Sequence, residues 1–325
     1  MSIHAVKRSQ CHLAWDNSIP PVLHIQSGET VTFDCLDASN GQITPDSTDA
    51  HISSLVFAQL DQVNGPIFVA GAAPGDTLQI DVLRVEPAHW GWTACIPGFG
   101  LLTDEFPDPA LKIWALDTDT MEAYFDEAKK VRIPLRPFAG EMGVAPGKQG
   151  VFSTIPPYAT GGNIDTKHLS EGATLFLPIE VEGALFSIGK SVVRPRFVHG
   201  LDLTWTGTAI ETPMKVTVRL SVRKDRPYTK TPHFSTPKVS ASAAAEDSYY
   251  CTTGIDTDMR EATRAAVRNM IVFLGAEHGM GRVDAYMLCS VAGDLRLHEV
   301  VDMPNYVVGM MIPRSVLGPP ATEVQ

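Results

Sequence analysis

The sequence predicts a mainly β fold, rich in hairpins of the β-sandwich or β-barrel kind, with a helical pair near the C-terminus, and therefore α+β overall. Apolar and polar residues alternate with a period of two in many short segments. The 26 glycines and 24 prolines of the 325-residue chain stand between apolar runs, where turns are expected. Strands and helices do not alternate regularly, which argues against a Rossmann fold or a TIM barrel.

The first 224 residues contain most of the predicted strands. The clearest alternation lies in 212–223, where four apolar residues share one face: Val216, Val218, Leu220 and Val222. Residues 120–130, which lie inside the predicted hairpin 111–138, are also compatible with a short helix. Hairpins, each consisting of two apolar runs around a turn, are predicted at 22–36, 66–87, 111–138 and 172–189.

The last third of the chain changes character. Asp256 or Asp258 can begin a helix that runs to about Leu274 and stops at Gly279. A second helix is predicted at 283–295, and the apolar run that ends the chain is predicted as a strand.

These patterns predict three parts of the chain. Residues 1–224 form a β-rich core, and 225–247, rich in Pro, Ser and Ala, form a linker or surface excursion. Residues 248–325 form an α/β part that packs on the same core.

Charge and composition exclude several classes of protein. With 26 basic and 37 acidic residues the net charge is −11, which argues against nucleic acid as the main partner. Apolar residues make up 44% and charged residues 19%, which excludes a disordered chain. No apolar run approaches the roughly 18 residues of a membrane span, and the N-terminus lacks a signal-peptide core. The five cysteines are far apart and indicate reduced thiols, so a cytoplasmic protein without a membrane partner is predicted.

Seven segments are more specific than generic β structure. They are WDNSIPP from Trp15, FDCLDASNGQ from Phe33, NGPIFV from Asn64, GWTACIPGFG from Gly91, GGNID from Gly161, GTAIE from Gly207 and CSVAGDLR from Cys289. In their order and spacing these segments resemble the acetamidase/formamidase family, over nearly the whole chain.

The resemblance implies hydrolysis of a short-chain amide such as formamide or acetamide to ammonia and the carboxylic acid. It also implies a β-sandwich-rich fold, a homo-oligomer of two or more chains, and a divalent metal ion near the catalytic pocket. The signatures of two other amidase types, with Ser-Ser-Lys or Glu-Lys-Cys sites, are absent.

Amide hydrolysis needs a nucleophile, a proton for the leaving amine and hydrogen-bond donors for the oxyanion. No G-x-S-x-G elbow is present, so a nucleophilic serine is unsupported. A water activated by a metal ion or by a carboxylate is the better mechanism. Carboxylate and imidazole ligands would suit zinc.

Asp37 and Asn40 follow a predicted strand, at a strand end where sites are often found. Alternatively, they form a turn in which their side chains bond the local backbone. Asn163 and Asp165 follow two glycines that permit close approach to a ligand, although a tight Gly-Asn turn explains them equally well. The resemblance favours a functional role for Asp37 and for the Asn163/Asp165 pair.

Glu211 directly precedes a strand with clean alternation. Partial burial of its carboxyl group would raise its pKa and suit a general base. The alternative is an exposed acid at a strand end. Trp92 can wall a small substrate pocket, although tryptophans are more often core residues. The candidate catalytic residues are therefore Glu211, Asp165 and Asn163, and the candidate substrate-binding residues are Asn40 and Trp92. The candidate metal ligands are Asp37, Asp165, Glu211 and His199.

One segment departs from the family pattern. Where the family has Gly-Asp, then a histidine and a Gln-Gly-Asp-Gly-Glu run, this chain has Gly189-Lys190 and lacks the run. His199 and Asp202 are the residues that could stand in for it, although their spacing does not match. The alternatives are a divergence with altered or lost activity and a local change of reading frame. Arg194 and Arg196 disfavour a divalent cation there, or alternatively hold an anionic substrate.

Two rival hypotheses remain beside an amidase. A catalytically impaired or redirected family member would keep the scaffold and act as a small-ligand-binding or structural oligomer. A lectin-like β-sandwich is the third possibility, although no lectin signature is present.

Overall fold

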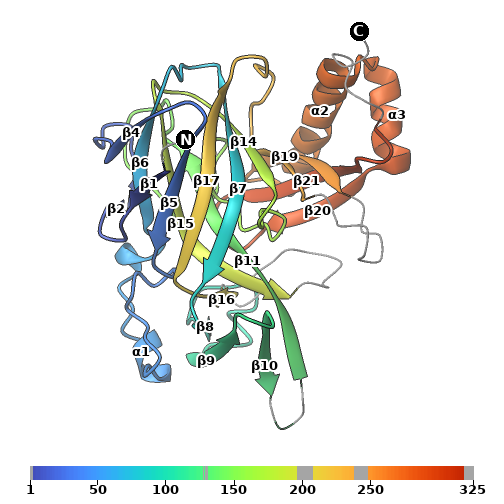
Figure 1. Ribbon diagram of the computed structural model, residues 1–325. Helices are drawn as coiled ribbons and strands as arrows, with labels where there is room; N and C mark the ends of the chain where they lie inside the picture. The colour runs from blue at the N-terminus through green and yellow to red at the C-terminus, as the bar shows by residue number, and fades with distance from the viewer. Residues whose placement is uncertain (1–2, 127, 129–130, 196–207, 238–247, 318–325) are drawn as a thin grey trace.

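Two large β-sheets share one apolar core and make up most of the molecule (Figure 1). The computed structural model describes residues 3–126, 128, 131–195, 208–237 and 248–317. Both sheets contribute side chains to the same buried cluster, among them Phe33 and Val218 from one and Ile67 and Phe186 from the other. The arrangement is mainly β with a C-terminal helical pair, as the sequence predicts.

The first sheet has nine strands. Its spatial order is β1 (Ile3–Val6), β5 (Glu29–Cys35), β17 (Met214–Arg223), β7 (Thr77–Pro87), β14 (Thr174–Pro178), β18 (His233–Ser235), β19 (Tyr249–Asp256), β21 (Tyr306–Pro313) and β20 (Asp294–Glu299). On β17 the predicted alternation is confirmed, because Val216, Val218 and Leu220 are fully buried. On the opposite face of β17, the Thr217 hydroxyl forms a hydrogen bond of 2.9 Å with the Thr32 hydroxyl of β5.

The second sheet has ten strands. Nine form the order β13 (Gly161–Asn163), β11 (Val131–Val144), β10 (Glu122–Asp126), β9 (Ala110–Asp117), β8 (Trp90–Cys95), β16 (Ile210–Glu211), β15 (Ala184–Pro195), β6 (Val63–Ala70) and β2 (Cys11–His12), and β4 (Leu23–Gln26) also pairs with β6. Because β11 pairs directly with β15 as well, the strands between them close into a ring. A separate pair joins β3 (Ala14–Trp15) to β12 (Phe152–Ser153).

The four predicted hairpin regions all contain strands, but three of them are not hairpins. At 22–36, 66–87 and 172–189 the two strands belong to different sheets (β4 and β5, β6 and β7, β14 and β15), because a strand–turn–strand pattern does not decide which strands pair. Region 111–138 holds β9, β10 and the start of β11, so 120–130 contributes a strand and not a helix. The segment predicted as a linker, 225–247, contributes β18 to the first sheet. The division into three parts stays a prediction.

The helices are α1 (Asp49–Ile52), the 3-10 helix η1 (Phe57–Gln59), α2 (Met259–His278) and α3 (Arg282–Ala292). The α2 start and stop are confirmed: the Asp258 side chain accepts hydrogen bonds from the Arg260 and Glu261 amides, and Gly279 ends the helix at φ 65°. Figure 1 shows α2 and α3 beside β19, β20 and β21, at the C-terminal end of the first sheet.

The predicted second helix, 283–295, is too long. Helix α3 ends at Ala292, and residues from Asp294 onward pair with β21 as strand β20. Helical spacing alone cannot foresee this pairing, since the edge of β21 supplies hydrogen bonds that override the local preference. Among the described residues, no helix combines the length and apolar composition required to cross a membrane.

Candidate active site

Strand β11 carries the first member of a buried polar centre. In the sheet register Glu141 lies opposite Asn163 of β13 on one side and opposite Gly189 of β15 on the other. The next residue of β15 is Lys190, and Asp165 lies two residues beyond Asn163. The side chains of these four polar residues, Glu141, Asn163, Asp165 and Lys190, are at most 3% exposed.

Further acids reach this centre from distant parts of the chain. Asp61 follows η1, Glu211 lies on β16, Glu299 ends β20 and Asp302 lies just beyond it. Each interacts electrostatically with Lys190. The term buried acid cluster refers here to the six residues whose carboxyl groups surround Lys190: Asp61, Glu141, Asp165, Glu211, Glu299 and Asp302.

The Lys190 ammonium is the centre of the contacts within the cluster. Its Nζ lies 3.0 Å from Asp165 Oδ2 and 3.8 Å from Asp302 Oδ2. It also donates a hydrogen bond to Asn163 Oδ1 at 3.2 Å. The amide nitrogen of Asn163 in turn donates to Asp302 Oδ2 at 2.7 Å and to the Ile155 carbonyl at 2.8 Å. Asn163 therefore holds Lys190 and Asp302 in fixed positions.

Several carboxylate oxygens of the cluster lack a hydrogen-bond partner among the described residues. Both oxygens of Glu141 belong to this set, as do Glu211 Oε2, Glu299 Oε2 and Asp302 Oδ1. The other Glu299 oxygen accepts from the amides of Val301 and Asp302, and the other Glu211 oxygen from the Ala209 amide. Unpaired buried acid oxygens are costly unless the acid is protonated or a ligand binds them, so they mark a candidate site.

Burial sets the proton affinities of these acids. It raises the pKa of Glu211 to about 8, although the Lys190 charge opposes the rise. Burial likewise raises the pKa of Asp61 to about 6, and it raises that of Glu141 well above its ordinary value. Burial alone would lower the pKa of Lys190, but Asp165 and Asp302 outweigh it and raise that pKa well above its ordinary value. The cluster therefore combines a charged ammonium with acids that can carry a proton near neutral pH.

Glycines allow this crowding. A Cβ on Gly140 of β11 would collide with the Asp165 carboxylate, and one on Gly161 would collide with the Met142 carbonyl oxygen. Gly161 and Gly162 both have positive φ, near 97° and 96°. The two glycines that the sequence suggests for ligand approach thus bring β13 against β11 and against Trp15.

The structure brings three predicted residues together in one centre: Asn163, Asp165 and Glu211. Asp37 lies beside this centre, because the side chain of Gln62, next to Asp61, donates to the Asp37 carbonyl at 3.1 Å. The Trp92 indole donates to Asp37 Oδ1 at 2.9 Å, and Ser39 also donates to that oxygen.

Asn40 lies in the turn after β5, at φ 58°, and its backbone amide donates to the Asp37 carbonyl at 3.0 Å. His199, Asp202 and Arg196 lie outside the described residues. The predicted roles of all these residues stay predictions.

Four acids of the cluster are absent from the sequence-based candidates: Asp61, Glu141, Glu299 and Asp302. One weak signal was present, since Glu141 is an acid inside an otherwise apolar run. Lys190 stands out in the sequence only as a departure from the family pattern, which does not indicate that the side chain is buried.

A metal ion would need ligands that the cluster supplies only in part. Among the described residues, three acids have oxygens within 4.8 Å of one another: Asp165, Glu299 and Asp302. This set shares only Asp165 with the predicted ligands. Oxygen-only ligands suit hard cations such as Mg²⁺ or Ca²⁺ better than zinc. The Lys190 ammonium already contacts two of the three acids, so the residues do not fit a divalent ion while Lys190 is charged.

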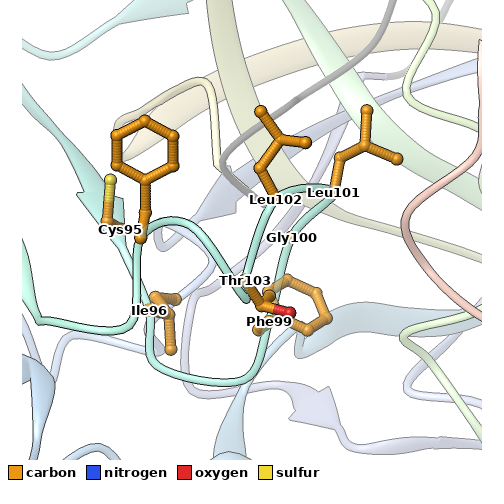
Figure 2. Close-up of a pocket in the computed structure, with 8 residues that line it drawn as sticks. Cys95, Ile96, Phe99, Gly100, Leu101, Leu102 and Thr103 are labelled. Carbon is orange, nitrogen blue, oxygen red and sulfur yellow. The ribbon is translucent and has the colours of Figure 1, made fainter.

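A small apolar pocket lies apart from the acids, in the loop that follows β8 (Figure 2). Its volume is about 80 Å³. Figure 2 shows Leu101 and Leu102 extending to the same side of this loop. The pocket begins at Cys95, three residues after Trp92, and no acid lines it. It can accept an apolar group but offers no acid–base chemistry.

Comparisons with known proteins extend over nearly the whole chain. The model of the Acetamidase/Formamidase family matches residues 2–153 and 148–318. A formamidase of Methylophilus methylotrophus is 24% identical over 371 residues, which cover 94% of this chain and 89% of that protein. A crystal structure of an acetamidase from Bacillus halodurans is 26% identical, with a TM-score of 0.83 and coverage of 96% of this chain and 97% of that one. An acetamidase structure from Yersinia enterocolitica is 27% identical, with a TM-score of 0.82 and coverage of 98% and 93%.

Proposed function

We propose that this chain, which belongs to the acetamidase/formamidase family and is an amidase, hydrolyses a short-chain aliphatic amide of the formamide or acetamide type to the carboxylic acid and ammonia. The buried acid cluster is the observation that carries this proposal. It holds unpaired acid oxygens and the Lys190 ammonium in one buried centre. Such a centre can activate a water molecule and stabilise negative charge on the substrate.

Glu211 is the proposed general base. Its free oxygen, Oε2, accepts a proton from water as the water oxygen attacks the amide carbon. The protonated acid then returns that proton to the leaving nitrogen, and ammonia departs. A carboxyl pKa near 8 suits this exchange, because the group can both accept and release a proton near neutral pH.

Lys190 and Asp165 are the proposed electrostatic partners of this reaction. The Lys190 ammonium stabilises the negative charge that develops on the carbonyl oxygen, and Asp165 at 3.0 Å fixes the ammonium. Asn163 holds the ammonium from its other side. The divalent metal ion implied by the resemblance stays a prediction, and no catalytic step is assigned to it. The substrate-binding roles of Asn40 and Trp92 likewise stay predictions.

Ammonia release from formamide and acetamide tests the proposal. We expect Glu211→Gln to lower kcat by about 100-fold or more, since general-base catalysis contributes about 10²–10⁴-fold. The control Glu86→Gln removes an exposed acid that pairs with Arg84, and it should leave kcat unchanged. Release should persist in the presence of a chelator.

The possible outcomes separate the rival hypotheses. Absence of ammonia release from the wild-type chain, with or without added zinc, would contradict the proposal and favour the redirected or structural family member. Release that a chelator abolishes and zinc restores would favour the metal-activated water over the carboxylate-activated one.

A further inference from the structure

We propose that the Lys190 ammonium is the resident cation of the buried acid cluster, in the position where Asp165, Glu299 and Asp302 would otherwise bind a divalent metal ion. Two consequences follow. The wild-type chain binds no divalent ion at these acids, and removal of the ammonium creates a divalent-cation site. The inference goes beyond amide hydrolysis, because it concerns which cation the fold contains.

The geometry places the ammonium among the ligands that a metal ion would use. Three carboxylate oxygens within 4.8 Å of one another match the spacing of ligands around a hard cation, which binds oxygen at about 2.0–2.6 Å. Lys190 Nζ contacts two of those acids, at 3.0 Å and 3.8 Å, and the Asn163 carbonyl oxygen at 3.2 Å. A divalent ion in the same place would meet an ammonium within a few ångströms, in a buried site where the repulsion between the two cations is weakly screened.

The backbone fixes the ammonium in this place. Gly189 is paired with Glu141 of β11 and with Val63 of β6, so strand β15 is held on both sides at this point. The Lys190 side chain is 3% exposed, and its backbone has φ 37°, in the left-handed region that side chains rarely adopt. A strained conformation of this kind persists only where the surroundings impose it. The backbone and the burial of the side chain together hold the Lys190 ammonium inside the cluster.

Charge balance explains why removal of the ammonium should favour metal binding. Six buried carboxyl groups surround the Lys190 ammonium, and Glu299 Oε2 and Asp302 Oδ1 have no hydrogen-bond partner among the described residues. Without Lys190 these acids must either take up protons or bind another cation. The space left by a shortened or apolar side chain would then lie beside acid oxygens that are already in place.

Bound metal, measured on the full-length protein, tests the inference. The chain is equilibrated with zinc, calcium or manganese chloride, passed through a gel-filtration column to remove excess ion, and analysed by inductively coupled plasma mass spectrometry. We expect Lys190→Met to retain about one divalent ion per chain and to gain thermal stability when the ion is added. The wild type should retain no more than the control Lys215→Met, which removes an exposed lysine of β17.

Two further variants assign the ion to the cluster. Glu299→Gln in the Lys190→Met background should lose the bound ion. A wild-type chain that retains one ion, and loses it on Asp302→Asn, would overturn the inference, as would a folded Lys190→Met protein that binds none. Should Lys190→Met fail to fold, Lys190→Met/Glu141→Gln keeps the formal net charge of the cluster and retains all three ligand acids. An ion bound by that variant supports the inference, and absence of binding overturns it.

These readouts do not depend on catalysis. A chain without amidase activity can still confirm the inference, and an active chain can still contradict it.

Discussion

His233 of β18 is fully buried, with its Nδ1 3.1 Å from the Tyr250 hydroxyl. Its Nε2 has no hydrogen-bond partner among the described residues. Burial, together with the nearby Arg226 charge, lowers its pKa to about 3. The folded protein therefore holds this imidazole neutral at pH values where the unfolded chain protonates it.

The sign of the resulting pH dependence follows from this difference. Above pH 6.5 the residue is neutral in both states and contributes no pH dependence. As the pH falls from 6.5 toward 3, only the unfolded chain takes up the proton, so the free energy of unfolding decreases. At pH 5 the expected loss is about 2 kcal/mol.

Urea unfolding of the wild type and of His233→Gln between pH 5 and pH 7 measures this effect. The variant should show a flatter pH profile, whatever its stability at pH 7, and the exposed-site control His24→Gln should keep the wild-type slope. Identical slopes for the wild type and His233→Gln would contradict a neutral buried His233.

At the scale of elements, the docking of α2 on the first sheet depends on the absence of a side chain at Gly254. A Cβ at this position of β19 would lie 2.5 Å from the Ala266 backbone nitrogen and closer still to the Ala262 carbonyl oxygen. Both are backbone atoms of α2, so no side chain can move aside. Ala262 and Ala266 are themselves fully buried, which keeps helix and strand in close contact.

Alanine substitutions at two glycines should therefore have opposite effects. Gly254→Ala should lower the free energy of unfolding by about 1–3 kcal/mol or more, because it separates α2 from the sheet. Gly275→Ala, inside α2, should raise it by about 0.5–1 kcal/mol, since alanine favours the helix. The added Cβ of Gly275→Ala has room, since it lies at an ordinary contact distance of 3.5 Å from the Met280 carbonyl oxygen.

Denaturant titrations of the two variants provide the measurement. A stable Gly254→Ala protein with an unchanged unfolding midpoint would show that α2 does not pack as closely as described.

At the scale of the whole molecule, the buried acid cluster links the two sheets. Glu141 and Glu211 belong to strands of the second sheet, whereas Glu299 ends strand β20 of the first. Burial holds the pKa of Glu211 at about 8, above its ordinary value of 4.5. Between these two values the folded state binds more protons than the unfolded state.

Glu211 should therefore make the free energy of unfolding fall as the pH rises from about 4.5 to 8, by on the order of 4 kcal/mol, and below pH 6.5 this contribution opposes that of His233. Glu211→Gln should remove this share of the decline, as measured by thermal or urea unfolding across that range. A decline of the same size in Glu211→Gln and in the Glu86→Gln control would assign it to other groups. The homo-oligomer implied by the resemblance stays a prediction at this scale, which light scattering can test.

The sequence by itself determined the strand and helix pattern and the family. Alternation in 212–223 predicts β17, and Asp258 and Gly279 predict both ends of α2, because these signals depend on neighbouring residues alone. The sequence also singled out Asn163, Asp165 and Glu211, three residues that do lie in the same buried centre.

Only the tertiary structure decided what surrounds them. Asp61, Glu141, Lys190 and Asp302 are brought together by sheet register and by the turn after β20, and no local periodicity records such contacts. The same limit explains the second helix, whose predicted end was wrong because β21 pairs with the residues that follow Ala292. Lys190 stood out in the sequence as a substituted position, but its role as a buried cation depends on carboxylates that only the folded chain places around it.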